Sequence, residues 1–176
     1  LFEGITTWTY LLGVTGAFTM VWAAFKAIKQ DDLKKILAYT TISALGVFFM
    51  MTGIGGKDAL NAAMLYLMAH ALYKGGLFLA TGSIERQIGT RKISEMSRLI
   101  KKMPATSFAV ILLCASMAGM LPFIGFLGKE SLYAALYQQD NTLSIIYLGA
   151  LFIASAFFTA VCIEIIYNAI FKKGKS

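Results

Sequence analysis

The chain has 176 residues, of which 58% are hydrophobic and 14% are charged, and its mean hydropathy is +0.70. A soluble domain of this size needs far more polar surface to cover its core, so the composition excludes most soluble folds. The net charge of +7 would suit a nucleic-acid partner, but the basic residues are interleaved with apolar runs rather than gathered on one polar face. The sequence therefore predicts an all-α, polytopic transmembrane helix bundle that lies in the lipid bilayer of a cell membrane and binds no nucleic acid.

About five apolar runs are long enough to cross the hydrocarbon layer, which takes roughly 20 helical residues. We expect the spans at residues 7–28, 33–54, 58–84, 106–137 and 142–171. The third is expected to begin at Asp58 as a helix N-cap, and a polar loop at 85–104 follows it. The chain begins at Leu1 with no signal-peptide pattern, so we expect a single membrane segment of a longer protein.

The fourth run is longer than one untilted span requires, and its middle carries residues that interrupt helices, namely Gly119, Pro122, Gly125 and Gly128. Proline lacks an amide donor and clashes with the preceding turn, so we expect a break near Pro122 that divides the span into two half-helices. A break at membrane depth frees backbone carbonyls and amides, which is tolerated where they line a cavity or meet an ion. The break is therefore a candidate part of an ion pathway.

The basic residues gather on one side of the predicted spans. In chain order they are Lys26, Lys29, Lys34, Lys35, Arg86, Arg91, Lys92, Arg98, Lys101, Lys102, Lys172, Lys173 and Lys175. The segments on the opposite side carry Lys57 alone. By the positive-inside rule the basic side is cytoplasmic and Leu1 faces outward, so the net charge is mainly a topology signal.

Two lysines, Lys74 and Lys129, lie within predicted spans, where a lysine at the bilayer centre costs about 3 kcal/mol even on a lenient scale. Tyr66, His70 and Lys74 recur every four residues, which stacks them on one helix face about 6 Å apart. Histidine titrates near neutral pH and a desolvated lysine releases its proton more readily, so His70 and Lys74 are predicted to relay protons with buried water. The alternative is that His70 packs between helices and Lys74 snorkels to a headgroup, which its mid-span position makes difficult.

Two further positions have alternative interpretations. Glu130 follows Lys129 directly after the predicted break. A buried pair of opposite charges serves either as a structural clip or in ion passage, and the adjacent break favours ion passage. Lys34 begins the second span, where anchoring at the cytoplasmic surface and a role in ion passage are equally compatible with its position.

Motifs for redox and metal chemistry are absent from the sequence. There is no phosphate-binding glycine loop, no cysteine cluster for iron and sulfur and no HExxH pattern, and the single histidine has no second imidazole with which to bracket a haem. Cys114 and Cys162 lie in apolar runs without metal-ligand spacing. We therefore expect neither a cofactor nor a metal ion.

Three motifs occur in order along the chain. Residues 32–43 read DLKKILAYTTIS, residues 67–79 read LMAHALYKGGLFL, and residues 115–126 read ASMAGMLPFIGF. They resemble, respectively, a helix-opening signature, a central histidine-and-lysine helix and a broken helix of the proton-conducting antiporter family. That family comprises the large subunits of Mrp-type Na+/H+ antiporters and the antiporter-like membrane subunits of respiratory complex I and related hydrogenases. Details at 40–46, 89–91 and 128–130 look most like the A-type large subunits of the Mrp antiporters.

The resemblance implies a proton pathway along a hydrated polar axis in a bacterial or archaeal plasma membrane. Lys34, Lys74 and His70 would lie on that axis, and Lys129 with Glu130 would link it to the outer surface. The implied partners are the other membrane subunits of a hetero-oligomeric antiporter complex, and the implied transported ions are protons and Na+.

The sequence departs from the family pattern at two positions. Tyr66 stands where complex I members often carry a second histidine, and Leu121 replaces the first proline of a common Pro-Pro pair. Three functions stay open at this point. The first is a proton-translocating subunit of a Na+/H+ antiporter, which is a transporter rather than an enzyme by itself. The second is a proton-pumping subunit of a redox-driven complex I or membrane-bound hydrogenase, and the third is a purely structural membrane subunit.

Overall fold

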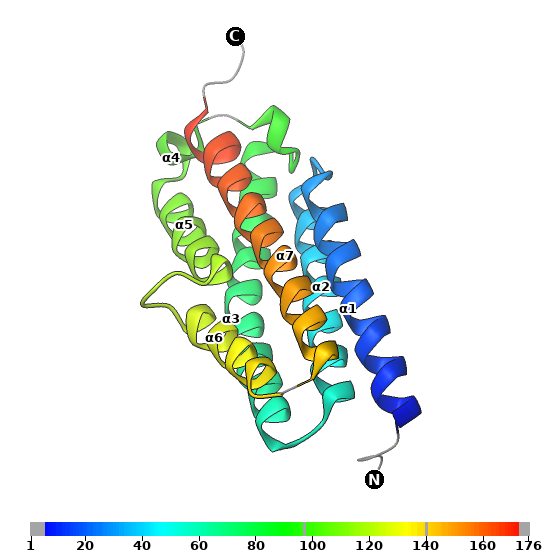
Figure 1. Cartoon of the computed structure of the whole chain (residues 1–176). Helices are drawn as coiled ribbons and strands as arrows, with labels where there is room; N and C mark the ends of the chain where they lie inside the picture. The colour runs from blue at the N-terminus through cyan, green and yellow to red at the C-terminus, as the bar shows by residue number, and fades with distance from the viewer. Residues whose placement is uncertain (1–5, 97, 140, 173–176) are drawn as a thin grey trace.

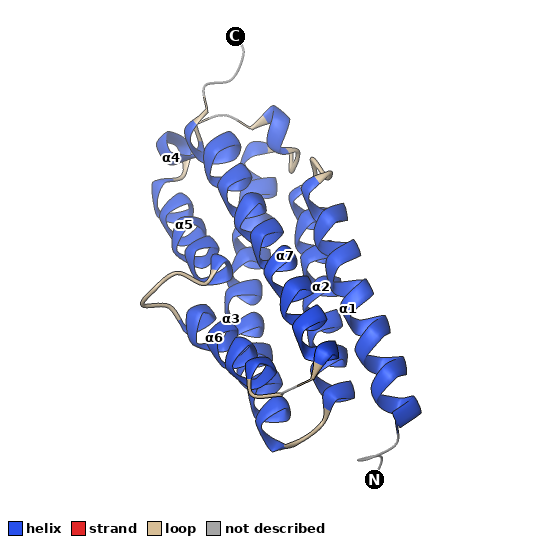
Figure 2. Cartoon of the chain, in the orientation of Figure 1, coloured by secondary structure: helices blue, strands red, loops and turns tan. Residues whose placement is uncertain are grey.

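The computed structural model describes residues 6–96, 98–139 and 141–172. The elements in chain order are α1 (Thr6–Ile28), α2 (Leu33–Ile54), α3 (Lys57–Ile88), η1 (Ile93–Glu95), α4 (Leu99–Lys102), α5 (Pro104–Ala118), α6 (Ile124–Tyr137), α7 (Thr142–Glu164) and η2 (Ile165–Phe171). Figure 2 shows helices joined by loops, with no strand in the described part of the chain. The predicted all-α bundle is confirmed.

Four helical stretches are long and apolar enough to cross a membrane, namely α1, α2, α3 and α7 continued by η2. The fifth predicted span is divided between α5, with 15 residues, and α6, with 14. Neither half reaches the roughly 20 residues of a full crossing. Because residues 119–123 lie outside both helices, the predicted break near Pro122 is confirmed.

The structure moves both ends of the third helix outward. α3 begins at Lys57, directly after Gly56, so Asp58 lies in its first turn rather than at the N-cap. At the other end α3 continues to Ile88 and stops at Gly89, whose φ of 83° is left-handed. The added turn contains glutamate, arginine and glutamine, which are good helix formers, so the helix outlasts its apolar stretch. The expected polar loop at 85–104 is accordingly shorter and itself contains η1 and α4.

α3 lies at the centre of the arrangement and contacts α2, α5 and α6. α7 packs against α1, α5 and α6. Figure 1 shows α5 and α6 following one another along α3, with the break between them. α3 therefore faces α2 and both halves of the broken span.

α1 and α2 approach each other closely at small residues. A Cβ added at Gly16 would lie 2.4 Å from the backbone nitrogen of Met50, and one added at Gly46 would lie 2.6 Å from that of Met20. Ser43 donates a hydrogen bond from its Oγ to the carbonyl of Met20 over 2.7 Å. In a bilayer, contact with another helix is no more apolar than contact with lipid tails. Helices therefore associate through close packing and interhelical hydrogen bonds of this kind.

The predicted basic segments meet at one end of the bundle, at the top of Figure 1. There the amide of Leu33 donates to the carbonyl of Arg91 over 3.0 Å, and the amide of Arg98 donates to the carbonyl of Lys172 over 3.1 Å. Two of the basic residues assigned to this side, Lys173 and Lys175, lie outside the described residues. That this end is cytoplasmic stays a prediction.

Candidate functional site

One face of α3 carries the polar side chains expected at mid-membrane depth. Tyr66, His70 and Lys74 are 5%, 6% and 4% exposed. Their spacing of four residues places them on one side of the helix. That side is enclosed by the helices that pack against α3, so these polar groups are shielded from the surroundings of the bundle.

The ammonium group of Lys74 is bound by α2. Its Nζ donates to the backbone carbonyl of Leu37 over 3.0 Å and also donates to the hydroxyl of Thr40. That hydroxyl donates to the carbonyl of Ile36 over 2.8 Å, so its lone pairs are available to accept from the lysine. Lys74 thus extends to a neighbouring helix and does not snorkel to a membrane surface. Both oxygens are neutral, so dipoles stabilise the charge.

His70 lies between two tyrosines of its own helix. Its Nδ1 is 3.1 Å from the hydroxyl oxygen of Tyr73. The centroid of its ring is 5.2 Å from that of Tyr73 and 6.2 Å from that of Tyr66. Imidazole and phenol groups can each donate or accept a hydrogen bond, so this cluster can hold a proton at more than one atom.

The second mid-span lysine, Lys129, is bound at the helix break. Its Nζ donates to the carbonyl of Ala118, the last residue of α5, over 2.9 Å and lies 5.7 Å from the ring centroid of Phe158. Carbonyls in the last turn of a helix have no intrahelical donor, so one is free for the lysine. Gly119 permits this contact, because its φ of 82° is left-handed and a Cβ there would lie 2.8 Å from Cδ of Lys129.

The other predicted break residues shape the junction. Pro122 lies in the connecting turn, where the Leu121–Pro122 peptide bond is cis. A Cβ added at Gly125 would lie 1.8 Å from the carbonyl oxygen of Ser116, so α6 meets the end of α5 at van der Waals distance. One added at Gly128 would lie 3.1 Å from Cα of Tyr66 on α3. The glycines therefore set the two half-helices against each other and against α3.

Two predicted positions lie elsewhere than expected. Glu130 is exposed, because consecutive residues of a helix project in different directions. The expectation of a buried pair between Lys129 and Glu130 is therefore wrong. Lys34 lies at the basic end of the bundle, where its Nζ is 2.5 Å from Oε2 of Glu85.

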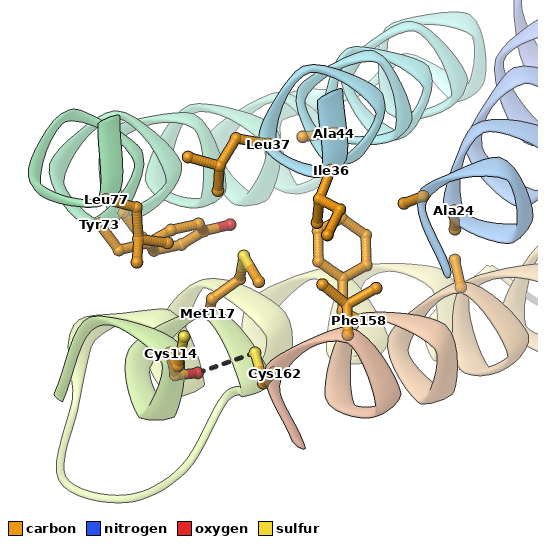
Figure 3. Close-up of a cluster of buried hydrophobic side chains, with 14 of the residues drawn as sticks. Ala24, Ile36, Leu37, Ala44, Tyr73, Leu77, Cys114, Met117, Phe158 and Cys162 are labelled. Carbon is orange, nitrogen blue, oxygen red and sulfur yellow. Dashed lines mark hydrogen bonds between the residues drawn. The ribbon is translucent and has the colours of Figure 1, made fainter. Parts of the chain in front are cut away.

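The space beside the polar face of α3 is filled by apolar and thiol side chains. Figure 3 shows Leu37 of α2 and Tyr73 of α3 directed toward Met117 of α5. Further along, Sγ of Cys162 donates to the carbonyl of Cys114 over 3.2 Å, as the dashed line marks. Both thiols are free and buried.

A charged cluster joins the ends of α2 and α3 at the basic end. We call Asp32, Lys34, Glu85 and Arg91 the rim cluster. Glu85 accepts from Lys34 and, over 3.4 Å, from Nη1 of Arg91, whose Nε donates to Oδ2 of Asp32 over 2.6 Å. Asp32 also caps α2 by accepting from the amides of Lys34 and Lys35 at 2.9 and 3.2 Å. Burial acts to raise the pKa of the Asp32 carboxyl, but the hydrogen bonds from Arg91 and the two amides outweigh it, so this pKa lies below its usual value.

Three contributors to these sites were not singled out from the sequence. Glu85 lies three helical turns after Lys74, a spacing that marks it as part of the same face. Thr40 stands beside Thr41, and the two hydroxyls are alike until the orientation of α2 is known. Arg91 reaches Asp32 across 59 residues, and no local pattern indicates that contact.

Comparison with known proteins identifies the family of the chain. It matches the family model described as NADH:quinone oxidoreductase/Mrp antiporter, TM, over residues 1–159. The chain belongs to this family. It is similar to the A1 subunit of the Na+/H+ antiporter of Staphylococcus aureus strains JH9 and Newman, with 37% identity over 167 residues and 86% of this chain covered. The match covers 21% of those relatives, so the chain spans about a fifth of their length.

Solved structures of membrane complexes contain the same fold. In the Mrp complex from Dietzia sp. DQ12-45-1b, a chain 33% identical aligns with a TM-score of 0.88, covering 96% of this chain and 19% of that chain. In the membrane-bound sulfane sulfur reductase, an archaeal respiratory membrane complex, a chain 25% identical aligns with a TM-score of 0.88, covering 99% and 35%. The predicted family and the membrane location are confirmed.

Proposed function

We propose that this chain is the proton-translocating part of one subunit in a multisubunit Na+/H+ antiporter. Protons are relayed between Lys74, His70 and bound water, and they leave past Lys129. The observation that carries the proposal is the setting of Lys74, a buried ammonium group bound by two neutral oxygens of α2. Ionisable groups at this depth are expensive to insert and characteristically mark ion pathways.

The setting of Lys74 suits both of its protonation states. The protonated amine donates to Leu37 and Thr40. After the proton leaves, the hydroxyl of Thr40 can rotate and donate to the neutral amine, because a hydroxyl is both donor and acceptor. A group that is satisfied before and after proton release is suited to a relay, whereas a lysine paired with a carboxylate would leave a buried charge behind.

His70 and the broken span supply the next positions. The imidazole lies one turn from Lys74 and contacts Tyr73, so a proton has a further acceptor on the same face of α3. Lys129, bound at the break, offers a second amine on α6. The proposed proton pathway also includes Lys34 at the rim cluster and Glu130 on the exposed face of α6.

The type of complex follows from the relatives. The identities of 37% and 33% to antiporter chains exceed the 25% to the sulfane sulfur reductase chain, which favours an antiporter over a redox-driven pump. The proposed partners are the other membrane subunits of the complex, together with the remaining helices of the parent protein. Protons and Na+ are the proposed transported ions.

The decisive experiment uses the full-length parent protein assembled in its complex and reconstituted in vesicles. Lys74→Ala is compared with Lys35→Ala, which removes the same charge from an exposed position in the first turn of α2. We expect Na+-driven proton movement, followed with a pH-sensitive dye, to fall to the level of protein-free vesicles in Lys74→Ala and to be retained in Lys35→Ala. Undiminished antiport in Lys74→Ala would reject the proposal.

A second variant separates transport from a purely structural role. Lys74→Met keeps much of the length and shape of the side chain but removes the ammonium group. A relay predicts that this complex assembles and does not transport. If it assembles and transports at the parent rate, the buried lysine serves only to fix the packing of α3 against α2.

A further inference from the structure

Four basic residues meet where α4 lies beside the end of η2. We call Arg98, Lys101, Lys102 and Lys172 the basic patch. The amide of Arg98 donates to the carbonyl of Lys172 over 3.1 Å, so the backbone joins the two segments directly. Lys101 and Lys102 follow Arg98 by about one helical turn, within α4. Figure 1 shows α4 next to the red end of the last helix, at the basic end of the bundle.

The turn that enters α4 has an uncommon backbone conformation. Arg98 has a φ of 44° and a ψ of 47°, which lie in the left-handed region that few residues other than glycine adopt. Its carbonyl accepts from the amide of Lys101 over 2.9 Å while its own amide donates to Lys172. Residues in this region persist only where the surrounding structure holds them, and they cluster at functional sites. The turn therefore fixes the two basic segments side by side.

The charges of the basic patch have no carboxylate partner among the described residues. Its three lysines are exposed and Arg98 is partly exposed. The ion pairs of the described residues are all made by other basic side chains. The ammonium group of Lys172 donates instead to the neutral amide oxygen of Asn168 over 3.4 Å. The patch is therefore free to bind an anion.

The acidic residues of the adjoining segments leave the patch positive. Glu95 on η1 already accepts from the hydroxyl of Thr90 over 2.6 Å and from Nζ of Lys92 over 2.9 Å. Glu164 lies about two helical turns before Lys172, within the apolar span. Neither carboxylate pairs with the basic patch, so its charge is directed outward.

Exposed apolar side chains accompany the basic patch. Ile100 on α4, Phe108 on α5 and Phe171 on η2 are all exposed. In a bilayer, exposed side chains on apolar helices contact acyl chains, and basic clusters at the ends of such helices attract anionic headgroups. A free phosphate or a nucleotide would use the charges alone and leave the apolar side chains without a partner. The combination favours a ligand with an anionic head and apolar tails.

We propose that the basic patch binds the headgroup of an anionic phospholipid, whose acyl chains lie against α5 and η2. The phosphate accepts charge-assisted hydrogen bonds from the guanidinium of Arg98 and from the lysines. The bound lipid clamps α4, at the start of the broken span, to the end of the last helix. This lipid site depends on the membrane location of the chain and not on the function proposed for Lys74.

The first test locates the lipid on the full-length parent protein, purified in its complex in detergent micelles. A photoreactive phosphatidylglycerol is added, and crosslinked peptides are identified by mass spectrometry. We expect crosslinks within residues 98–108 and 165–172 that unlabelled phosphatidylglycerol displaces. Phosphatidylcholine, which has no net charge, and inorganic phosphate should displace them poorly.

Two results of this competition would overturn the proposal. Equal displacement by phosphatidylcholine and phosphatidylglycerol would reduce the site to general contact with lipid. Displacement by inorganic phosphate as effective as that by phosphatidylglycerol would make it a site for soluble anions.

Matched variants test the charges of the patch. Lys101→Gln/Lys102→Gln is compared with Lys29→Gln/Lys35→Gln, which removes the same charge from exposed lysines at the ends of α1 and α2. Two lysines at a membrane surface contribute about thirtyfold in affinity for anionic lipid, so displacement in the patch variant should require about thirtyfold more phosphatidylglycerol. The control should match the parent. Equal displacement curves for the two variants would contradict a role for these lysines.

The second test uses the parent complex alone and decides the matter if the patch variant fails to assemble. Acetylation of Lys101 and Lys102 by a water-soluble reagent is followed by mass spectrometry after the lipid has been removed. We expect phosphatidylglycerol, but not phosphatidylcholine, to slow this acetylation severalfold. If the two lysines are already shielded without lipid, another subunit covers the basic patch and the lipid site is overturned. Neither test measures transport, so failure here leaves the function proposed for Lys74 intact.

Discussion

Lys74 and Lys129 both place an ammonium group inside the bundle, but the chain stabilises them in different ways. Lys74 reaches an unbroken neighbouring helix and bonds one backbone carbonyl and one hydroxyl there. Lys129 bonds the carbonyl of Ala118, which is available because its own span is interrupted. One site therefore depends on the identity of a side chain, and the other depends on the path of the backbone.

Both lysines donate to neutral oxygens, so a lysine inside the bundle does not require a carboxylate. A neutral oxygen is enough if the packing holds it in place, and a helix end or a threonine can supply one. Substitutions at the break should therefore affect the Lys129 site through folding, and substitutions on α2 should affect the Lys74 site with the fold intact.

The largest effect is expected from Gly125→Ala. Its Cβ would lie 1.8 Å from the carbonyl oxygen of Ser116, so α5 and α6 would be forced apart. We expect the purified full-length complex to lose about 3 kcal/mol of stability or to fail to assemble, as measured by thermal denaturation and native gels. The matched control is Gly149→Ala on α7, where an added Cβ meets no atom within 4 Å. That variant should be as stable as the parent or up to about 1 kcal/mol more stable.

The result bears directly on the contrast between the two lysines. If Gly125→Ala assembles with parent stability, the junction tolerates displacement, and the Lys129 site does not depend on this close approach. If both glycine variants are destabilised equally, the effect belongs to helix substitution in general and not to the break.

A smaller effect is expected from Thr40→Val, which keeps the shape of the side chain and removes the hydroxyl that accepts from Lys74. A hydrogen bond to a charged group contributes roughly 1.5–3 kcal/mol, so antiport in reconstituted vesicles should fall about tenfold or more. Assembly should be retained, because the carbonyl of Leu37 still accepts from the lysine. The control is Thr52→Val, whose hydroxyl bonds the carbonyl of Phe48 within α2.

Equal transport by the two threonine variants would contradict the proposed difference between the two lysine sites, since Lys74 would then not depend on a particular side chain. A loss of assembly in Thr40→Val would also count against it, because the Lys74 site would then be structural in the same sense as the break.

The helical framework could be predicted from the sequence because a bilayer imposes a fixed length. Runs of about 20 apolar residues mark the spans, and Pro122 among glycines marks the break. The polar face of α3 could also be predicted, since Tyr66, His70 and Lys74 recur at the helical period. These features depend on local spacing, which the sequence contains in full.

The partners of the charged groups could not be predicted, because they depend on the relative rotation of helices. Nothing in the sequence distinguishes Thr40 from Thr41 as the acceptor for Lys74. The pairing of Lys129 with Glu130 was expected from their adjacency in sequence, but adjacency in a helix separates side chains. Lys129 finds its acceptor instead at Ala118, which only the folded break brings near.

The smallest effect concerns the rim cluster, where ion pairs lie near water and contribute less than the buried contacts. The pKa of Asp32 is lowered in the folded protein, so its stabilising contribution is present above the usual value of 3.8 and is lost as the pH falls below it. The segment after α3 is docked on α2 by the amide of Leu33, which donates to the carbonyl of Arg91, and by the amide of Ile93, which donates to the backbone carbonyl of Asp31 over 2.8 Å. We expect hydrogen exchange of these two amides, corrected for intrinsic rates, to quicken severalfold between pH 6 and pH 3, while amides in the middle of α2 do not change.

Asp32→Asn is the matched variant, because it removes the titrating carboxylate and keeps a side chain that can cap α2. It should show the faster exchange of the two docking amides already at pH 6 and little further change at pH 3. If the parent protein shows no change with pH, the bond from Arg91 to Asp32 does not hold the segment, and docking rests on the backbone contacts and on the bonds that the Asp31 carboxylate accepts from Ser94. The ion pair of Asp32 would then be dispensable for docking, in contrast to the hydroxyl of Thr40 that binds Lys74.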